Sequence, residues 1–212
     1  HQEQPFPPNA TTTPKAMVSV SYNHTFELHY NNTGWNLITM PVKHPSIHTA
    51  SDLIQYINTF SADNCTVVTR WDREYQRYDS YVVPEGDGFG VAFTIVPGEG
   101  YFVFVKTNIT VYMEGCLIEY DEINLTLNVG YNMIGWANLE VINASQLAGN
   151  ISGCTKVAKW NASAQGWFMP EYIVGDSPDF NISIGEAMFV FRPTGGHIHW
   201  IGGRDMLQLP PP

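Results

Sequence analysis

Basic residues are scarce in this sequence. Ten Lys and Arg stand against twenty Asp and Glu among its 212 residues, which gives a formal net charge of −10 at pH 7. Binding to nucleic acid or to an anionic bilayer needs a basic surface that such a composition does not supply. Long apolar runs are also missing, and no stretch approaches the roughly eighteen residues of a transmembrane helix. We therefore exclude nucleic acid as a partner and expect no membrane insertion.

Helical periodicity is as scarce as positive charge. Only residues 49–57 and 143–148 contain a Ser-X-Leu segment in which Ser or Thr can cap one or two helical turns. The rest of the chain alternates short apolar or aromatic runs with Gly, Pro and Asn, which is typical of strands joined by turns. We predict an all-β fold of two tandem duplicated units, each β-sandwich-like or a partly open barrel, with an extended N-terminal tail and strand. The lack of helices excludes a parallel α/β architecture.

The chain contains an internal repeat. Residues 93–105 return as residues 180–192 with Gly-Glu and Phe-Val-Phe kept in register, and each copy is typical of a tight turn that leads into a buried strand. Two further pairs of segments match in the same order: 34–38 with 130–134, and 65–72 with 154–161. We therefore divide the chain into three parts: an N-terminal tail and strand at 1–25, a first β-repeat at 26–116 and a second β-repeat at 117–212.

Glycosylation sequons are unusually frequent. Ten asparagines begin an Asn-X-Ser/Thr sequence, where the frequency of Ser and Thr would give roughly two or three. They are Asn9, Asn23, Asn31, Asn64, Asn108, Asn124, Asn143, Asn150, Asn161 and Asn181. Some of them can simply reflect the suitability of Asn and Thr for turns. The excess predicts an extracellular protein that carries many N-linked glycans.

Three cysteines permit at most one internal disulfide. The spacing does not select the pair among Cys65, Cys116 and Cys154. Cys65 and Cys154 occupy matching repeat positions and could meet across a pseudo-symmetric interface, whereas Cys116 lies at the junction of the repeats and could bond to either. We expect one disulfide in an exported protein; the alternative is three small buried thiols.

The beginning of the chain differs from both repeats. Residues 1–16 contain four prolines and three consecutive threonines, so they are expected to form a flexible, extended leader. They do not have the basic and apolar regions of a signal peptide, and we interpret the polar start as a mature terminus left after cleavage. Residues 16–30 alternate well enough to form a strand, and the first half of this strand has no counterpart in the second repeat.

Four motifs carry a family resemblance: Gly34-Trp35-Asn36-Leu37-Ile38, Thr49-Ala50-Ser51-Asp52-Leu53, Arg70-Trp71-Asp72 and Pro97-Gly98-Glu99-Gly100-Tyr101-Phe102. In these motifs the chain resembles β-repeats of archaeal and some bacterial secreted or surface proteins. The resemblance covers residues 26–204, and the second repeat departs from it at Ile184, Ala187 and Met188. It implies a structural or adhesive role at the cell surface. Because it supplies no catalytic set, we expect neither an enzyme nor a cofactor.

A tail ahead of a glycosylated β head also resembles the subunits of archaeal surface filaments called threads, which form homopolymers by donor-strand complementation. The resemblance implies that the tail of one subunit completes the sheet of the next. We expect the donor strand within residues 12–25, with these residues as candidates: Ala16, Met17, Val18, Val20 and Tyr22. The alternative is that this strand pairs within its own head. Threads also resemble filaments with isopeptide cross-links, for which Lys15 is the candidate because it is the only lysine of the tail.

The histidines offer weak metal sites. A mature His1 could form a copper brace like that of lytic polysaccharide monooxygenases, but a Pro-rich tail does not hold it rigidly. His197 and His199 have strand spacing and could share a metal, although no third ligand is near in sequence. His44 and His48, which flank a proline in a loop, are weaker candidates. We therefore expect no metal site.

Two acidic features have structural explanations. Glu99 and Glu186 recur in equivalent corners and could suggest a paired-carboxylate glycosidase, but duplication explains them better, and we expect both to accept backbone N–H groups in their turns. Residues 85–88, Glu-Gly-Asp-Gly, could bind Ca²⁺, but an oxygen cage usually has more carboxylates.

Aromatic residues decide between two functions. The matched pairs Trp71 with Trp160 and Tyr78 with Trp167 are expected in the core, because they recur across diverged repeats. If these rings were instead exposed in a row, they would form a sugar-binding surface. The chain would then be a secreted carbohydrate-binding or adhesin module that acts as a monomer. Our main hypothesis is a structural subunit of an extracellular, N-glycosylated surface filament or surface layer, with adhesion as its biological role.

Overall fold

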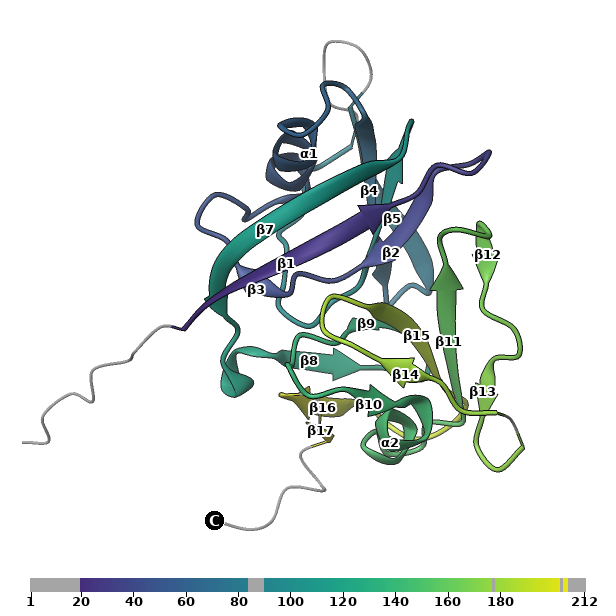
Figure 1. Cartoon of the computed structure of the whole chain (residues 1–212). Helices are drawn as coiled ribbons and strands as arrows, with labels where there is room; N and C mark the ends of the chain where they lie inside the picture. The colour runs from purple at the N-terminus through teal and green to yellow at the C-terminus, as the bar shows by residue number, and fades with distance from the viewer. Residues whose placement is uncertain (1–19, 84–89, 177, 203, 206–212) are drawn as a thin grey trace, which may run out of the picture.

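The computed structural model describes residues 20–83, 90–176, 178–202 and 204–205 (Figure 1). The predicted all-β, sandwich-like class is confirmed: the chain forms several antiparallel sheets, and no sheet in the described ranges closes into a barrel. Neither of the two α-helices in these ranges has the length and apolar character needed to cross a membrane.

Two sheets and one helix make up the first unit. One sheet has the strand order β1-β7-β3 and the other has the order β2-β6-β4-β5. The elements are β1 (Ser21–Leu28), β2 (Trp35–Ile38), β3 (Val42–Lys43), α1 (Ala50–Asn58), β4 (Cys65–Asp72), β5 (Arg77–Val82), β6 (Tyr101–Val105) and β7 (Ile109–Leu117). The long strands β1 and β7 lie side by side over one face of this unit (Figure 1).

The second unit repeats this plan with shorter strands. Its main sheet has the order β12-β11-β15-β9, with β13 also paired to β11; the other sheets are β17-β16-β8 and β10-β14. After a 3-10 turn at Tyr120–Glu122, the elements are β8 (Asn124–Leu127), β9 (Gly130–Gly135), β10 (Ile142–Asn143), α2 (Ala144–Gly149), β11 (Lys156–Asn161), β12 (Gly166–Trp167), β13 (Tyr172–Ile173), β14 (Asn181–Ile182), β15 (Ala187–Arg192), β16 (Ile198–Ile201) and β17 (Arg204–Asp205).

Each unit has its own hydrophobic core. One cluster of buried side chains comes from residues 26–113 and a second comes from residues 118–200. The repeated Phe-Val-Phe segments form β6 and β15, the interior strands of the two main sheets, as their apolar sequence indicates. Val103 and Val190 face the two cores with no exposed surface, while Phe102 and Phe189 point from the opposite faces of these strands.

The two helices begin with equivalent caps. The Thr49 side chain accepts from the backbone N–H of Asp52, and the Asn143 side chain accepts from that of Gln146. In return, the side chains of Asp52 and Gln146 accept a hydrogen bond from the backbone N–H of the capping residue. Such a capping box satisfies N–H groups that the first turn of a helix leaves unpaired, which explains why helices form at these two points of a β-rich chain.

A third cluster joins the units. It consists of the buried Phe102, Met133, Ala158 and Phe189, with four partly buried side chains packed around them: Trp35, Leu37, Trp71 and Trp160. Trp71 packs edge-on against Phe189 at 5.3 Å between ring centroids, and Trp160 packs edge-on against Phe102 at 5.4 Å. Equivalent residues therefore make equivalent contacts, so a pseudo-twofold axis relates the two units.

The strand that follows the tail pairs within its own chain. Residues Ser21–Leu28 form β1 against β7, and Tyr22 lies opposite Gly115. Leu117 also donates its N–H to the carbonyl of Val20. The alternative to donation, in which this strand pairs within its own head, therefore describes Val20 and Tyr22, the two candidate donor residues that lie in the described ranges. Several predicted residues lie outside the described ranges: His1, Asn9, Lys15, Ala16, Met17, Val18 and residues 85–88.

The expected disulfide is not formed. Cys65, Cys116 and Cys154 are all free thiols. Cys65 and Cys154 do occupy equivalent positions, but each is buried in the core of its own unit, so they do not meet at the interface. The correction has a physical reason: repeat symmetry relates two positions without bringing them together. Burial in apolar surroundings raises the pKa of Cys65 to about 12, because it disfavours the thiolate.

Candidate functional site

The tip of each two-stranded hairpin reaches across to the other unit. Trp71, at the end of β4, donates its Nε1–H to the carbonyl oxygen of Tyr131 at 2.8 Å. Trp160, at the end of β11, donates to the carbonyl oxygen of Trp35 at 2.9 Å. Tyr131 and Trp35 are equivalent residues near the start of β9 and β2, so both hairpins are held in the same way.

A glutamine completes each of these contacts. Gln76 accepts from the N–H of Tyr131 at 2.7 Å and donates to its carbonyl at 2.9 Å. Gln165 makes the same two bonds to Trp35, at 2.8 and 3.0 Å. Both glutamines have positive φ, of 51° and 52°, which places their side chains at the turn of the hairpin. The amide side chain thus pairs with backbone groups much as a neighbouring strand would.

Two aromatic pockets flank the pseudo-twofold axis. One has a volume of about 260 Å³ and is lined by Trp71, Tyr78, Tyr131, Ala158, Trp167, Glu171 and Phe189. The other has a volume of about 360 Å³ and is lined by Trp35, Thr69, Tyr78, Ser80, Phe102, Trp160 and Trp167. Every residue of one list has its repeat counterpart in the other. Tyr78 and Trp167 line both pockets and are 50% and 38% exposed.

The expectation that the matched aromatic pairs lie in the core is therefore correct only for one pair. Trp71 and Trp160 are partly buried between the units, whereas Tyr78 and Trp167 reach solvent. Recurrence in both repeats cannot distinguish a core position from an interface position, because duplication repeats both kinds of side chain.

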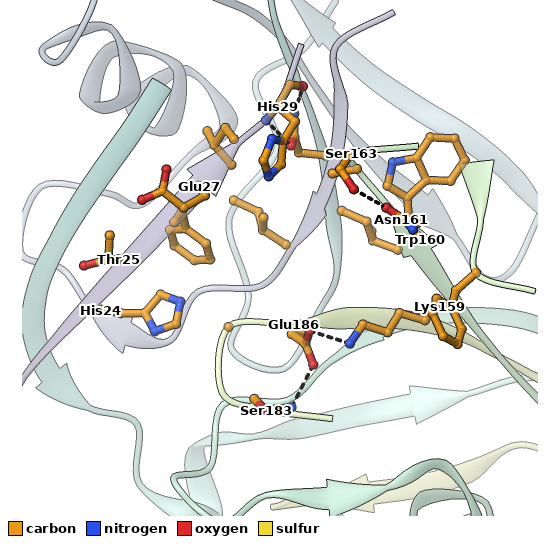
Figure 2. A pocket seen from close by; sticks show the side chains of 18 of the residues that line it. His24, Thr25, Glu27, His29, Lys159, Trp160, Asn161, Ser163, Ser183 and Glu186 are labelled. Carbon is orange, nitrogen blue, oxygen red and sulfur yellow. Dashed lines mark hydrogen bonds and ion pairs between the residues drawn. The ribbon is translucent and has the colours of Figure 1, made fainter. Parts of the chain in front are cut away.

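A cleft with a volume of about 530 Å³ lies between the first and second units. It is bordered by β1, β2, the end of β11 and the corner at residues 183–186 (Figure 2). Its polar side chains come from both units, and those labelled in Figure 2 are His24, Thr25, Glu27, His29, Lys159, Asn161, Ser163, Ser183 and Glu186. We call this space the open cleft.

Glu186 is the central charge of the open cleft. One carboxylate oxygen accepts the N–H of Ser183 at 2.8 Å, as expected for a turn, and the other pairs with the ammonium group of Lys159 (Figure 2). Lys159 also donates to the carbonyl of Asn181 at 3.4 Å. The side chains of Glu186 and Lys159 are 34% and 24% exposed, so the pair is accessible from the cleft.

His24 forms one wall of the open cleft and packs on the glycine corner. Gly185 has φ +87°, and a Cβ there would come within 2.5 Å of the His24 ring. The His24 ring also packs edge-on against Phe26 at 4.5 Å. Burial lowers the pKa of His24, and the negative charge of Glu186 opposes this shift. No local sequence pattern indicates this role of His24, because its partner Gly185 belongs to the other unit.

A second cleft, of about 400 Å³, occupies the equivalent position in the other half of the molecule. Here Arg73 fills the space in front of the corner. Its guanidinium pairs with Glu99 and donates to the carbonyl of Thr126 on β8 at 3.2 Å. Glu99 also accepts the hydroxyl of Tyr101 at 3.0 Å. The side chains of Arg73 and Glu99 are only 15% and 11% exposed, so we call this space the filled cleft.

The expected role of the two glutamates is thus correct for Glu186 alone. Glu186 accepts a backbone N–H in its turn, whereas the contacts of Glu99 are with the side chains of Arg73 and Tyr101. Met188 stands at the repeat position of Tyr101 and has no hydroxyl to offer. The two corners therefore kept their backbone shape and diverged in what their carboxylates bind.

The sequon asparagines are distributed over both units. Those with exposed side chains are Asn23, Asn31, Asn108, Asn124 and Asn181, and those with half-buried side chains are Asn143, Asn150 and Asn161. Asn64 differs, with only 3% of its surface exposed. Its side chain accepts from the N–H groups of Lys106 and Thr107 and donates to the carbonyl of Thr107.

Neither of the two histidine pairs forms a metal site with further ligands in the described ranges. His197 and His199 lie with their rings perpendicular, at 5.9 Å between centroids, and both are exposed. His44 packs against Tyr56 instead, and His48 contacts the carbonyl of Pro45. Within the described part of the chain, no three His, Cys, Asp or Glu side chains lie close enough to hold a metal ion.

Comparisons with family models, with curated proteins and with solved structures found no match to this chain. The features that bear on function are therefore the two aromatic pockets, the open cleft with its filled counterpart, and the sequons on the surface.

Proposed function

We propose that this chain is the β head of an extracellular, N-glycosylated structural subunit of a surface filament or surface layer, with adhesion as its role. The observation that carries the proposal is the position of the sequons. Of the nine sequon asparagines in the described ranges, eight keep exposed or half-buried side chains, although the cores lie a few residues away along the same strands. Accessible amide nitrogens on both units are what N-glycosylation requires.

Glycopeptide mapping of the chain from its native source tests the glycosylation. We expect glycans at exposed positions such as Asn108 and none at Asn64, whose side-chain nitrogen is buried and already donates a hydrogen bond. These two asparagines form a matched pair, because both stand beside the same turn and both precede Thr at the second following position. A chain without glycans at every exposed sequon would remove the basis of the proposal.

Assembly is assigned to the segment before β1. Because β1 supplies Phe26 and Leu28 to the core of its own unit and Val20 already accepts a bond from Leu117, the segment offered to a neighbour is restricted to residues 12–19. An extended segment can pair with an open sheet edge of a second copy. Among the described strands, β1 and β5 each pair on one side only, so each leaves such an edge.

Removal of residues 1–19 tests this assignment without damaging β1. We expect the shortened chain to keep the unfolding midpoint of the full chain and to stay monomeric by light scattering at concentrations at which the full chain forms large assemblies. Removal of residues 206–212 provides the control and should leave assembly unchanged. Assembly that persists without residues 1–19 would show that the segment does not join subunits.

A second candidate function, carbohydrate binding, is favoured by the two aromatic pockets. Sugar rings present C–H faces that stack on aromatic rings, and small-molecule sites combine such rings with a few polar groups. Trp167 and Tyr78 provide accessible rings in both pockets, with Glu171 and Ser80 as the polar groups.

Glycan-array binding with tryptophan fluorescence tests the second candidate. We expect a bound oligosaccharide to quench the fluorescence and Trp167→Ala to abolish the response, because one ring serves both pockets. Tyr75→Ala is the control, since Tyr75 is 65% exposed and lies outside the pockets. Equal binding by the two variants, or no binding by the unaltered chain, would reject carbohydrate recognition at these pockets.

A further inference from the structure

The two clefts are repeat counterparts, and one of them contains its own ligand. Trp71, Asp72 and Arg73 follow one another at the filled cleft, and Trp160, Asn161 and Ala162 follow one another at the open cleft. Ala162 therefore stands where the filled cleft has Arg73. From this difference we infer that the open cleft is a receptor site for a guanidinium group, presented by an arginine side chain of a partner polypeptide.

The filled cleft shows how such a group is held. The guanidinium of Arg73 pairs with the Glu99 carboxylate of the first unit and donates to the Thr126 carbonyl of the second. A planar guanidinium has donors on separate nitrogens, so it can bridge a carboxylate and a carbonyl at the same time. Arg73 thereby bridges the glycine corner and the edge of the facing strand.

The open cleft keeps both acceptors. Glu186 is the repeat counterpart of Glu99, and Glu27 on β1 is the counterpart of Thr126 on β8. Val20 accepts a bond from Leu117, so the even-numbered residues of β1 face β7 in the antiparallel ladder. The carbonyl of Glu27 therefore points to the open edge of β1, as the carbonyl of Thr126 points to the open edge of β8.

Lys159 does not take the place of the missing arginine. Its counterpart, Arg70, pairs with Asp79 on β5, whereas in the second unit Phe168, which follows Trp167 and donates its N–H to the Lys159 carbonyl, stands opposite Lys159. Without that carboxylate, Lys159 turns to Glu186 and to the carbonyl of Asn181. An ammonium is a compact charge that cannot span the cleft as a guanidinium can, and about 530 Å³ between Glu186 and β1 stays open.

One position at the corner is polar in the open cleft and apolar in its counterpart. Ile123, which is buried, packs on Gly98, whereas His24 takes the equivalent position, lines the open cleft and packs on Gly185. Asn161 and Ser163, joined by a hydrogen bond of 2.8 Å, border the cleft beside Ala162. These groups can bond to a peptide backbone and to the polar end of an arginine side chain, while Phe26 and Ile184, which also line the cleft, can contact its apolar stem. The inference does not depend on assembly of the chain into filaments.

Titration of the full chain with a capped Ala-Arg-Ala peptide, followed by calorimetry, tests the proposal. The matched control is the same peptide with citrulline, which keeps the shape of arginine and removes the charge. We expect one arginine peptide to bind per chain, and the citrulline peptide to bind at least about tenfold more weakly. Equal affinity for the two peptides, or no binding of the arginine peptide, would overturn the proposal.

Two variants locate the site. Ala162→Arg should abolish binding, because its own guanidinium would fill the cleft as Arg73 fills the other; thermal unfolding identifies a variant that fails to fold. Lys159→Met should tighten binding several-fold, since it removes the cation that shares Glu186. Binding that survives Ala162→Arg in a folded chain, or that weakens with Lys159→Met, would place the peptide elsewhere and reject the open cleft.

Discussion

The glycine corner is the residue-scale feature that positions the open cleft. Gly185 combines φ +87° with a close approach to the His24 ring. We expect Gly185→Ala to cost about 2–4 kcal/mol, from backbone strain and from displacement of the ring. Gly175 has φ +88° with open space around it, so Gly175→Ala should cost only about 1 kcal/mol. Chemical denaturation measures both, and equal losses would show that the packing against His24 is unimportant.

The two ion pairs at the corners differ in burial, and this difference determines how much each contributes to the free energy of unfolding. Arg73→Ala leaves Glu99 nearly buried without its cation, and we expect a loss of about 3–5 kcal/mol. Lys159→Ala removes a pair that is about a third exposed on the Glu186 side, and we expect a loss of about 1 kcal/mol or less. Urea unfolding of the two variants compares them. A larger loss for Lys159→Ala would contradict the distinction between filled and open clefts.

His24 gives the stability a dependence on pH. Burial lowers the pKa of His24 in the folded chain below its ordinary value of 6.5, although Glu186 opposes the shift. As the pH falls, His24 is therefore protonated in the unfolded chain before it is protonated in the folded chain. The stability that the folded chain gains from keeping His24 neutral is complete above pH 6.5 and decreases as the pH falls below this value. Burial also lowers the pKa of His44, which adds to the slope.

We expect His24→Gln to reduce the loss of stability between pH 6.5 and the lower folded-state pKa, measured as unfolding midpoints across this range. His199→Gln is the control, because His199 is exposed on β16. An unchanged pH profile for His24→Gln would show that His24 is not protected from protonation in the folded chain.

At the scale of the elements, the two hairpin tips hold the units together by the same bonds. Trp160→Phe keeps most of the ring packing and removes the donor to the Trp35 carbonyl, and Trp71→Phe does the same at Tyr131. We expect losses of about 1 kcal/mol for each, and nearly equal values because the contacts are equivalent. Thermal unfolding measures them. Values that differ by about 2 kcal/mol would contradict the pseudo-twofold arrangement.

Local sequence was sufficient to predict much of the architecture. Periodicity and turn residues predicted the strand class, the buried Phe-Val-Phe strands and helical turns within residues 49–57 and 143–148, where the structure has helices at 50–58 and 144–149. These features depend on neighbours along the chain. The turn role of Glu186 was predictable for the same reason, since its partner Ser183 lies three residues away.

The clefts could not be predicted, because they depend on contacts between the units. The difference between Arg73 and Ala162 is visible when the repeats are aligned, but its meaning depends on which strand faces the hairpin tip. The contact of Arg73 with Thr126 spans 53 residues, and no local pattern indicates it. The disulfide prediction failed for a similar reason, since equivalent positions of Cys65 and Cys154 did not imply proximity.

At the scale of the molecule, two small cores and an aromatic interface form one head. The interface carries both the aromatic pockets and the clefts, so every candidate site depends on the packing of one unit on the other. The proposed pairing of the segment before β1 with a second copy would turn the head into a repeating structure.

Negative-stain electron microscopy of the full chain, beside the chain that lacks residues 1–19, tests the proposed function most directly. The account predicts ordered filaments or sheets for the full chain and dispersed particles for the shortened chain. Dispersed particles for both, at concentrations from dilute to near saturation, would contradict it.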